Sequence, residues 1–301
     1  MRIIHARKRV WKRDLAFQNK FTLLVWILSI VKWKEYGHKV ILYCDKETLN
    51  EIKKFGFDVL YDEINTELFE NNDNYKDIDF YYYWAMPKII SLYYETYHLG
   101  NNALVADQDV VPMQDLTYLT KRADCLVWSN KEYVELRNIY PRVEELSLPK
   151  NYELPQWFSG YARPLNTGVI YFKNKQHVIE YCNEVFKYVK GNNNERKNTR
   201  CIAMCNAEQR MLGEYLVYKD LTYCTVQPNN EGLFNDRAFH MHGYKNYINN
   251  DNGLLWQANL LKLIEKSNRA MYTKLINNEW FKEEKEHMSK YNLVDELKQY
   301  M

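Results

Sequence analysis

The chain has 301 residues, enough for one large domain or two small domains with a sizeable core. Its 41 Lys and Arg residues nearly balance its 39 Asp and Glu residues, and the net charge of +2 gives no reason to expect a nucleic-acid partner. The most apolar segment, residues 21–33, is shorter than the roughly 20 residues that span a bilayer, and it lacks the cleavage site of a signal peptide. We therefore expect a cytoplasmic protein.

The six cysteines form no Cys-x-x-Cys pair and mostly lie in apolar contexts, as Cys44 and Cys125 do. We expect reduced thiols and no zinc site. Residues 2–13 are rich in Arg and Lys. This basic start is equally consistent with an anionic ligand, a solvated surface, or at most a peripheral contact with lipid headgroups.

The first third of the chain alternates between apolar strands and helical segments. Strands are predicted at residues 2–6, 39–44 and 57–61. Helices are predicted from a cap at Asp14 to about Tyr36, and over residues 45–55. This alternation predicts an α/β fold with a parallel sheet.

A polar loop at residues 65–79 precedes a predicted helix over residues 82–98, which tolerates Pro87 only near its first turn. The strand at residues 103–106 follows. Further elements are predicted as strands at 126–128 and 165–172, helices at 177–189 and 207–215, and mostly helix from 254 onward. We expect one domain over residues 1–250 and a helical extension over 251–301 that packs on it.

The strand at 103–106 leads directly into Asp107-Gln108-Asp109. Ligands of open α/β sheets bind at the carboxyl ends of strands. Residues i and i+2 of an extended chain point the same way, so both carboxylates can face one divalent cation. A solvated strand end explains the same pattern, and Asp77-Ile78-Asp79 repeats it without a preceding apolar run.

Three later stretches are also polar where the fold predicts a ligand. Asn166-Thr167-Gly168 opens a strand, where glycine indicates either a bulge or a close approach. Glu208-Gln209 lies at a predicted helix start. Glu is also common in a solvated first helical turn, because the helix dipole favours an acidic side chain there. The segment from His240 to Lys245 offers imidazoles, a glycine and an ammonium, or simply a pair of surface histidines.

Taken in this order, the four stretches resemble glycosyltransferases of the GT-A fold, in particular glycosyltransferase family 8 and related bacterial sugar transferases. The segment 104–111 is similar to the family's Asp-x-Asp motif, 165–169 to its Asn-Ala-Gly strand, and 207–212 to its Asp-Gln-Asp segment. Residues 240–245 resemble its His-x-x-Gly-x-x-Lys segment. The resemblance covers roughly residues 1–250 and implies a Rossmann-like, mostly parallel sheet flanked by helices.

The resemblance implies a UDP-sugar donor, Mn²⁺ or Mg²⁺, a glycan or lipid-linked acceptor, and transfer with retention, as in the synthesis of a surface polysaccharide. It assigns the metal ligands to Asp107, Asp109, His240 and His242. It assigns cofactor binding to His5, Ala6, Lys88, Asp107, Gln108, Gly243 and Lys245. It assigns contacts with the reacting sugars to Asn166, Glu208 and Gln209. Trp157 and Tyr161 could stack on the acceptor or belong to the core.

Three departures from the family pattern concern particular residues. The first strand runs into His5-Ala6-Arg7-Lys8 instead of acidic residues, which bears on recognition of the base. Arg210 replaces the last Asp of the Asp-Gln-Asp segment. The His segment is one residue short before Lys245, which leaves His240 and His242 both open as the metal ligand.

Two other functions are compatible with parts of this pattern. A non-catalytic nucleotide- or glycan-binding protein could keep the same fold. A metal-dependent phosphohydrolase would need a nucleophilic Asp near the end of the first strand, and His5-Ala6-Arg7 does not provide one.

Overall fold

The computed structural model describes most of the chain. The described residues are 1–9, 19–70, 73–129, 140–149, 151–191, 199–227, 237–240 and 251–288, with the side chains of 251, 252, 287 and 288 excepted. The predicted cap Asp14 therefore lies outside the described residues, as do His242, Gly243 and Lys245.

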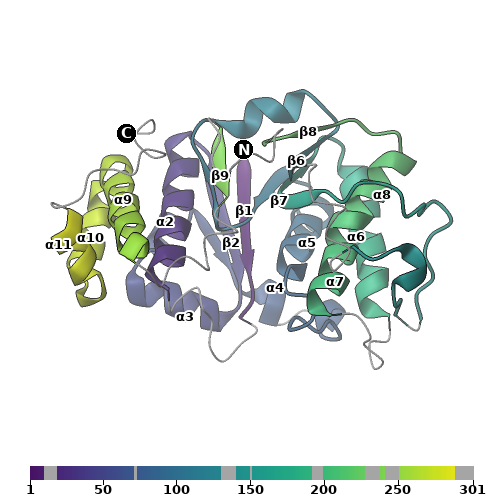
Figure 1. The fold of residues 1–301 in the computed structure, drawn as a ribbon, viewed down its shortest axis with the longest axis horizontal. Helices are drawn as coiled ribbons and strands as arrows, with labels where there is room; N and C mark the ends of the chain where they lie inside the picture. Colours follow the sequence, from purple (N-terminus) through teal and green to yellow (C-terminus); the bar gives the residue numbers. More distant parts are fainter. Residues whose placement is uncertain are drawn as a thin grey trace.

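A seven-stranded sheet in the order β3-β2-β1-β4-β7-β6-β8 forms the centre of the molecule (Figure 1). Its strands are β1 (Arg2–Arg7), β2 (Lys39–Cys44), β3 (Glu63–Asn65), β4 (Ala103–Ala106), β6 (Cys125–Ser129), β7 (Asn166–Phe172) and β8 (Tyr223–Thr225). All neighbouring strands pair in parallel except β7, which is antiparallel to both β4 and β6. The predicted α/β fold with a mostly parallel sheet is confirmed.

Helices cover both faces of the sheet. They are α2 (Lys20–Glu35), α3 (Lys46–Phe55), α4 (Glu67–Glu70), α5 (Met86–Tyr93), α6 (Lys175–Lys190), α7 (Arg200–Cys205), α8 (Met211–Tyr218), α9 (Asp251–Ser267), α10 (Arg269–Ile276) and α11 (Lys282–Met288). Short 3₁₀ turns lie at Asp58–Leu60, Asp73–Tyr75, Leu116–Lys121, Val143–Glu145 and Glu279–Phe281, and π-helical turns at Tyr94–His98 and Asn206–Arg210.

Two hydrophobic cores lie on opposite faces of the sheet because successive strand residues point to opposite sides. Ile3 and Leu104 belong to the core beneath α2 and α9, whereas Ile4 and Val105 belong to the core beneath α5, α6 and α8. α2 is buried along almost its whole length, since it is apolar on every side and lies between the sheet and α9. Within the described residues, no helix combines the length and apolarity needed to cross a membrane.

α9 packs against α2 on the side of the molecule away from α6–α8, and α10 and α11 pack on α9 (Figure 1). The ammonium of Lys20 lies 2.9 Å from a carboxylate oxygen of the buried Glu284. The Lys274 ammonium donates to the carbonyl of Gly56 at 2.8 Å. These contacts attach α10 and α11 to α2 and the end of α3.

Several predicted boundaries are wrong. The third strand was predicted at residues 57–61, but residues 58–60 form a 3₁₀ turn and β3 follows at Glu63–Asn65. α2 starts at Lys20, where the side chain of Asn19 accepts from the Thr22 amide. The helix predicted over 82–98 starts at Met86, because the preceding residues form turns, and ends in a π-helical turn.

A two-stranded antiparallel sheet joins β5 (Val110–Pro112) to β9 (Ala238–His240). β5 follows β4 after a short turn, and β9 comes from a distant part of the chain. Their register pairs Val110 with His240. This small sheet therefore places His240 beside the end of β4, where the two aspartates lie.

Candidate functional site

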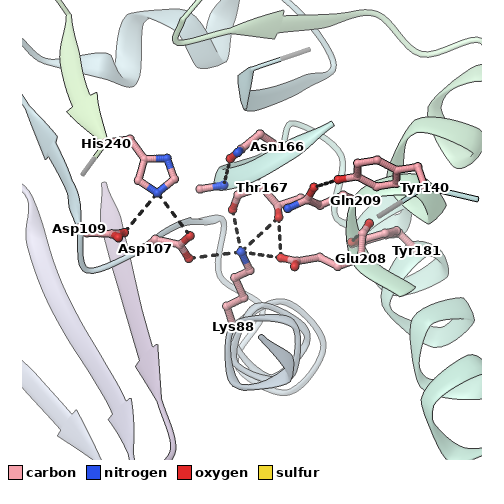
Figure 2. A network of polar contacts seen from close by, with 11 residues as sticks. Lys88, Asp107, Asp109, Tyr140, Asn166, Thr167, Tyr181, Glu208, Gln209 and His240 are labelled. Carbon is pink, nitrogen blue, oxygen red and sulfur yellow. Dashed lines mark hydrogen bonds and ion pairs between the residues drawn. The ribbon is translucent and has the colours of Figure 1, made fainter. Parts of the chain in front are cut away.

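Asp107 and Asp109 lie on a turn that joins β4 to β5. The Asp107 amide donates to the Gly168 carbonyl at 2.8 Å, and the Val110 amide donates to the Asp107 carbonyl at 3.0 Å. The expected extended chain is thus replaced by a tight turn. The turn still brings both carboxylates to the same side, beneath the imidazole of His240 (Figure 2).

The two carboxylates and His240 form a compact cluster. His240 Nε2 lies 3.2 Å from Asp109 Oδ1 and 3.9 Å from Asp107 Oδ2. One possible ligand atom from each residue lies within 4.8 Å of the others. Asp109 and His240 are buried, and Asp107 is partly exposed. Two carboxylate oxygens and an imidazole nitrogen are suitable ligands for a divalent cation such as Mn²⁺.

Gly168 explains how His240 fits beside the sheet. A Cβ atom at this position would lie 2.7 Å from Cε1 of the His240 ring. The Trp128 and His240 rings pack edge to face, with 5.1 Å between their centroids. Gly168 is therefore needed because the His240 ring comes close to the strand. The bulge that was the alternative explanation lies elsewhere: the register of β6 against β7 shifts between Val127 and Ser129.

Lys88 extends from the first turn of α5 to the centre of the site (Figure 2). Its ammonium donates to Asp107 Oδ1 at 3.2 Å and to the carbonyl and hydroxyl oxygens of Thr167 at 3.0 and 3.1 Å. It also lies 2.5 Å from Glu208 Oε1. Burial opposes the charge, but the Asp107 and Glu208 carboxylates outweigh it and raise the pKa of Lys88.

Glu208 lies in the π-helical turn Asn206–Arg210, between α7 and α8. The Thr167 hydroxyl donates to its carboxylate at 2.6 Å, and the Tyr181 hydroxyl donates to its backbone carbonyl at 3.0 Å. Burial raises the pKa of Glu208, and the Lys88 ammonium opposes this effect. The predicted helix start at residue 207 is wrong, because the helix already begins at Arg200, where Thr199 provides the cap.

The antiparallel placement of β7 explains why these residues meet. The end of β4 lies beside the start of β7, with Ala106 opposite Val169. Asp107 is consequently adjacent to Thr167 and Gly168, although about 60 residues separate them in the chain. The sheet order alone thus brings together the Asp-x-Asp and Asn-x-Gly stretches.

Comparison with protein families gives a match that covers all of these residues. A family model described as nucleotide-diphospho-sugar transferase matches residues 36–253, which is more than half of the chain. The chain belongs to the nucleotide-diphospho-sugar transferase family. It is a glycosyltransferase with a GT-A-like fold, and the predicted enzyme class is confirmed. The narrower resemblance to glycosyltransferase family 8 stays a prediction.

Two solved structures match over most of the chain. A structure titled "PaToxG Glycosyltransferase" is 11% identical with a TM-score of 0.35, covering 98% of this chain and 87% of that one. S. aureus TarS 1-349 is 11% identical with a TM-score of 0.36, covering 95% of this chain and 78% of that one. Scores this low carry no argument about the site. A search of the curated proteins found no match.

In this transferase, Asn166 and Gln209 lie beside the Lys88–Glu208 pair (Figure 2). The Asn166 side-chain oxygen accepts from the Gly168 amide at 2.8 Å. The Gln209 side-chain oxygen accepts from the Tyr140 hydroxyl. Both side chains are partly exposed. Their predicted contacts with the reacting sugars stay predictions, as does that of Glu208.

His5 and Ala6 of the first strand, and Gln108 beside them, are predicted to contact the nucleotide, and all three have partners within the protein. His5 is fully buried, with ring nitrogens 3.2 Å from the Tyr61 hydroxyl and 3.4 Å from the Ser29 hydroxyl. Burial lowers the pKa of His5 to about 3, so the ring is neutral at pH 7. The Gln108 amide donates to the Ala6 carbonyl at 2.7 Å. Gln108 thus ties the aspartate turn to β1, and a role in nucleotide binding stays a prediction for all three residues.

Arg210 has a structural function that its place in the Asp-Gln-Asp segment did not reveal. Its guanidinium donates to the carbonyls of Pro141 and Gly160 at 2.7 and 2.9 Å. On the next turn, Glu214 accepts from the amides of Ser159 and Ala162 at 2.9 and 3.0 Å. These two side chains attach Pro141 and residues 159–162 to the π-helical turn and to α8.

Trp157 and Tyr161, the two residues predicted either to stack on the acceptor or to belong to the core, differ. Trp157 packs against the core and stacks on Tyr218, with 5.2 Å between ring centroids and an interplanar angle of 14°. Tyr161 is 93% exposed. Sequence reasoning missed Trp128 and Tyr140, which hold His240 and Gln209. Trp128 ends a predicted strand, but nothing in the sequence linked it to the histidine.

Proposed function

We propose that the chain transfers a sugar from a UDP-sugar to a glycan or lipid-linked acceptor in the cytoplasm, with Mn²⁺ or Mg²⁺ and with retention of configuration. The observation that carries this proposal is the Asp107–Asp109–His240 cluster, whose possible ligand atoms lie within 4.8 Å of one another. Family membership supplies the reaction class, and the cluster supports the dependence on metal.

The cluster is suited to a leaving group that gains negative charge. When bound, a divalent cation stabilises the charge that develops on the departing diphosphate. Asp107 and Asp109 would hold it through carboxylate oxygens, and His240 through Nε2. The Lys88 ammonium, 3.2 Å from Asp107 Oδ1, orients that carboxylate and adds positive charge at the same edge of the sheet.

Retention is proposed because the carboxylates of this network have other functions. Inverting transfer needs a general base that takes the proton of the acceptor hydroxyl on the face opposite the leaving group. Glu208 is buried and pairs with Lys88 at 2.5 Å and with the Thr167 hydroxyl. Asp107 and Asp109 belong to the metal cluster. Asn166 and Gln209 would hydrogen-bond the sugars and position them.

The test measures UDP released from a panel of UDP-sugars, with Mn²⁺, with Mg²⁺ and with a chelator. The proposal expects release with at least one donor, its loss under the chelator, and a product whose anomeric proton in NMR shows retention. Release that is unaffected by the chelator would refute metal dependence. If the chain binds the nucleotide but releases no UDP from any donor, with or without an added acceptor, the non-catalytic binding protein would be favoured.

A further inference from the structure

A turn of aromatic residues, residues 81–84, precedes α5, the helix whose first turn carries Lys88. Tyr82 and Tyr83 are buried, whereas Tyr81 is 51% exposed and Trp84 is 39% exposed. The turn is well held, because the Tyr82 and Tyr83 amides donate to the Asp79 carbonyl at 3.0 and 2.9 Å. The two exposed rings are therefore presented by a fixed backbone, and core packing explains only the two buried ones.

Arg200, the first residue of α7, lies against both exposed rings. Its guanidinium carbon is 4.2 Å from the centroid of the Tyr81 ring and 5.5 Å from that of Trp84. Stacking on aromatic faces fixes the plane of a guanidinium, whose N–H groups point outward in that plane and match a carboxylate or phosphate. We call Tyr81, Trp84 and Arg200 the aromatic–arginine patch.

Two chain segments connect the patch to the candidate site: the one that leads into α5, and the one that begins at Arg200 of α7. Trp84 precedes Lys88 by four residues, and Arg200 precedes Glu208 by eight. Lys88 and Glu208 meet at 2.5 Å, so the same two segments meet at the network and again at the patch. Eight residues at about 1.5 Å each place Arg200 about 12 Å from Glu208 along the helix. A short oligosaccharide can span this separation.

We propose that the aromatic–arginine patch binds an acidic sugar of the acceptor glycan, one that bears a carboxylate or a phosphate. This assignment rests on the proposed sugar transfer, because it concerns the acceptor of that reaction. The Tyr81 and Trp84 rings stack on the apolar face of a pyranose, and Arg200 pairs with the anionic group by charge-assisted hydrogen bonds.

The test uses three methyl glycosides that differ only at C6: methyl glucoside, methyl glucuronide and methyl glucoside 6-phosphate. Their binding to the full chain with Mn²⁺ and UDP is measured by ligand-observed NMR titration. The proposal expects at least one acidic glycoside to bind more tightly than the neutral one. Tighter binding of the glucuronide or of the phosphate identifies which anion the acceptor carries.

Arg200→Gln is expected to weaken the preferred acidic glycoside roughly tenfold, since it removes a charge-assisted pair, and to leave the neutral glycoside unchanged. Trp84→Leu should weaken all three. Arg122→Gln is the matched control, because Arg122 also stacks on a tyrosine, Tyr118, at 5.0 Å. A thermal melt of each variant verifies that it is folded.

Equal binding of the three glycosides by the unaltered chain would overturn the proposal, and so would equal effects of Arg200→Gln and Arg122→Gln. Binding of UDP with Mn²⁺ is measured in the same samples and should not change in either variant. If the unaltered chain binds the acidic glycoside but not UDP with Mn²⁺, the proposed transfer fails and the patch stands as a glycan site. If UDP binds and the acidic preference is absent, only the patch assignment fails.

Discussion

The polar network has two halves that differ in charge (Figure 2). In the metal half, Asp107 and Asp109 lie close together beside the His240 imidazole. In the helix half, the Glu208 carboxylate is matched by the Lys88 ammonium at 2.5 Å. The helix half is balanced by the protein itself, whereas the metal half gathers negative charge. This difference supports the proposal that the helix half keeps the site in shape and that the metal half binds a cation.

Asp107 connects the two halves, since it contacts Lys88 through Oδ1 and faces His240 with Oδ2. The supports of the two halves are also different. The metal half is built on the turn after β4 and the end of β9, and the helix half on α5 and a π-helical turn. Substitutions in one half should therefore affect metal and nucleotide binding most, and substitutions in the other should affect stability most.

The largest expected effect comes from Asp109→Asn, which keeps the shape of the side chain and removes its charge. We expect Mn²⁺-dependent UDP release to fall on the order of 100- to 1000-fold, because a group that stabilises developing charge is lost. Asp77→Asn is the matched control, since Asp77 is exposed and is the first residue of the second Asp-x-Asp stretch of the chain. Equal rates for the two variants would remove the metal half from the mechanism.

Glu208→Gln breaks the balance of the helix half. We expect a loss of roughly 3 kcal/mol in the free energy of unfolding, because the buried Lys88 loses a charged partner. Urea denaturation measures it. Glu63→Gln is the control. It removes the charge of an exposed carboxylate that pairs with Arg2 at 2.8 Å, and it should cost less than about 1 kcal/mol. Losses of the same size in both variants would contradict a special role for the buried pair.

Gly168→Ala places a methyl group against the His240 ring, where a Cβ would lie 2.7 Å from Cε1. We expect about 2 kcal/mol of destabilisation from overpacking and weaker Mn²⁺ binding. The same substitution in a His240→Ala background should cost clearly less, since the ring is absent and only the contact with Asn166 Oδ1, at 3.1 Å, remains. A double-mutant cycle from denaturation data measures the difference, and additive effects would show that the ring is not the reason for the glycine.

The last prediction concerns pH and His5. Because burial lowers its pKa to about 3, the unfolded chain binds a proton that the folded chain rejects. The stability associated with neutral His5 is complete above pH 6.5 and falls as the pH drops towards 3, by at most about 1.4 kcal/mol per pH unit. His5→Asn should flatten the dependence of unfolding free energy on pH between 6.5 and 4, and exposed His98→Asn should not. Identical slopes would contradict a neutral, buried His5.

The sequence was sufficient where a residue's function depends on its own strand or helix. The apolar run before Asp107, the position of Pro87 and the alternation of early elements predicted the sheet and the edge at which the site lies. The ordered motifs predicted Lys88, both aspartates and His240 as neighbours, and the structure brings these four together.

Sequence reasoning failed where a contact depends on register or on a turn. The need for Gly168 comes from the His240 ring, which only the pairing of β5 with β9 brings close. The π-helical turn around Glu208 interrupts a helix whose start the polar pattern placed seven residues too late. Arg210 binds two backbone carbonyl groups, and the pattern of side chains in a sequence does not show which carbonyl groups lie near an arginine.

The most direct measurement of the central claim is a crystal structure with Mn²⁺ and UDP, in which the anomalous signal of manganese locates the ion. The account predicts one peak within bonding distance of the Asp107 and Asp109 carboxylates and His240 Nε2, in contact with the diphosphate. Bound UDP without a manganese peak at these three side chains, or with the peak elsewhere, would contradict it.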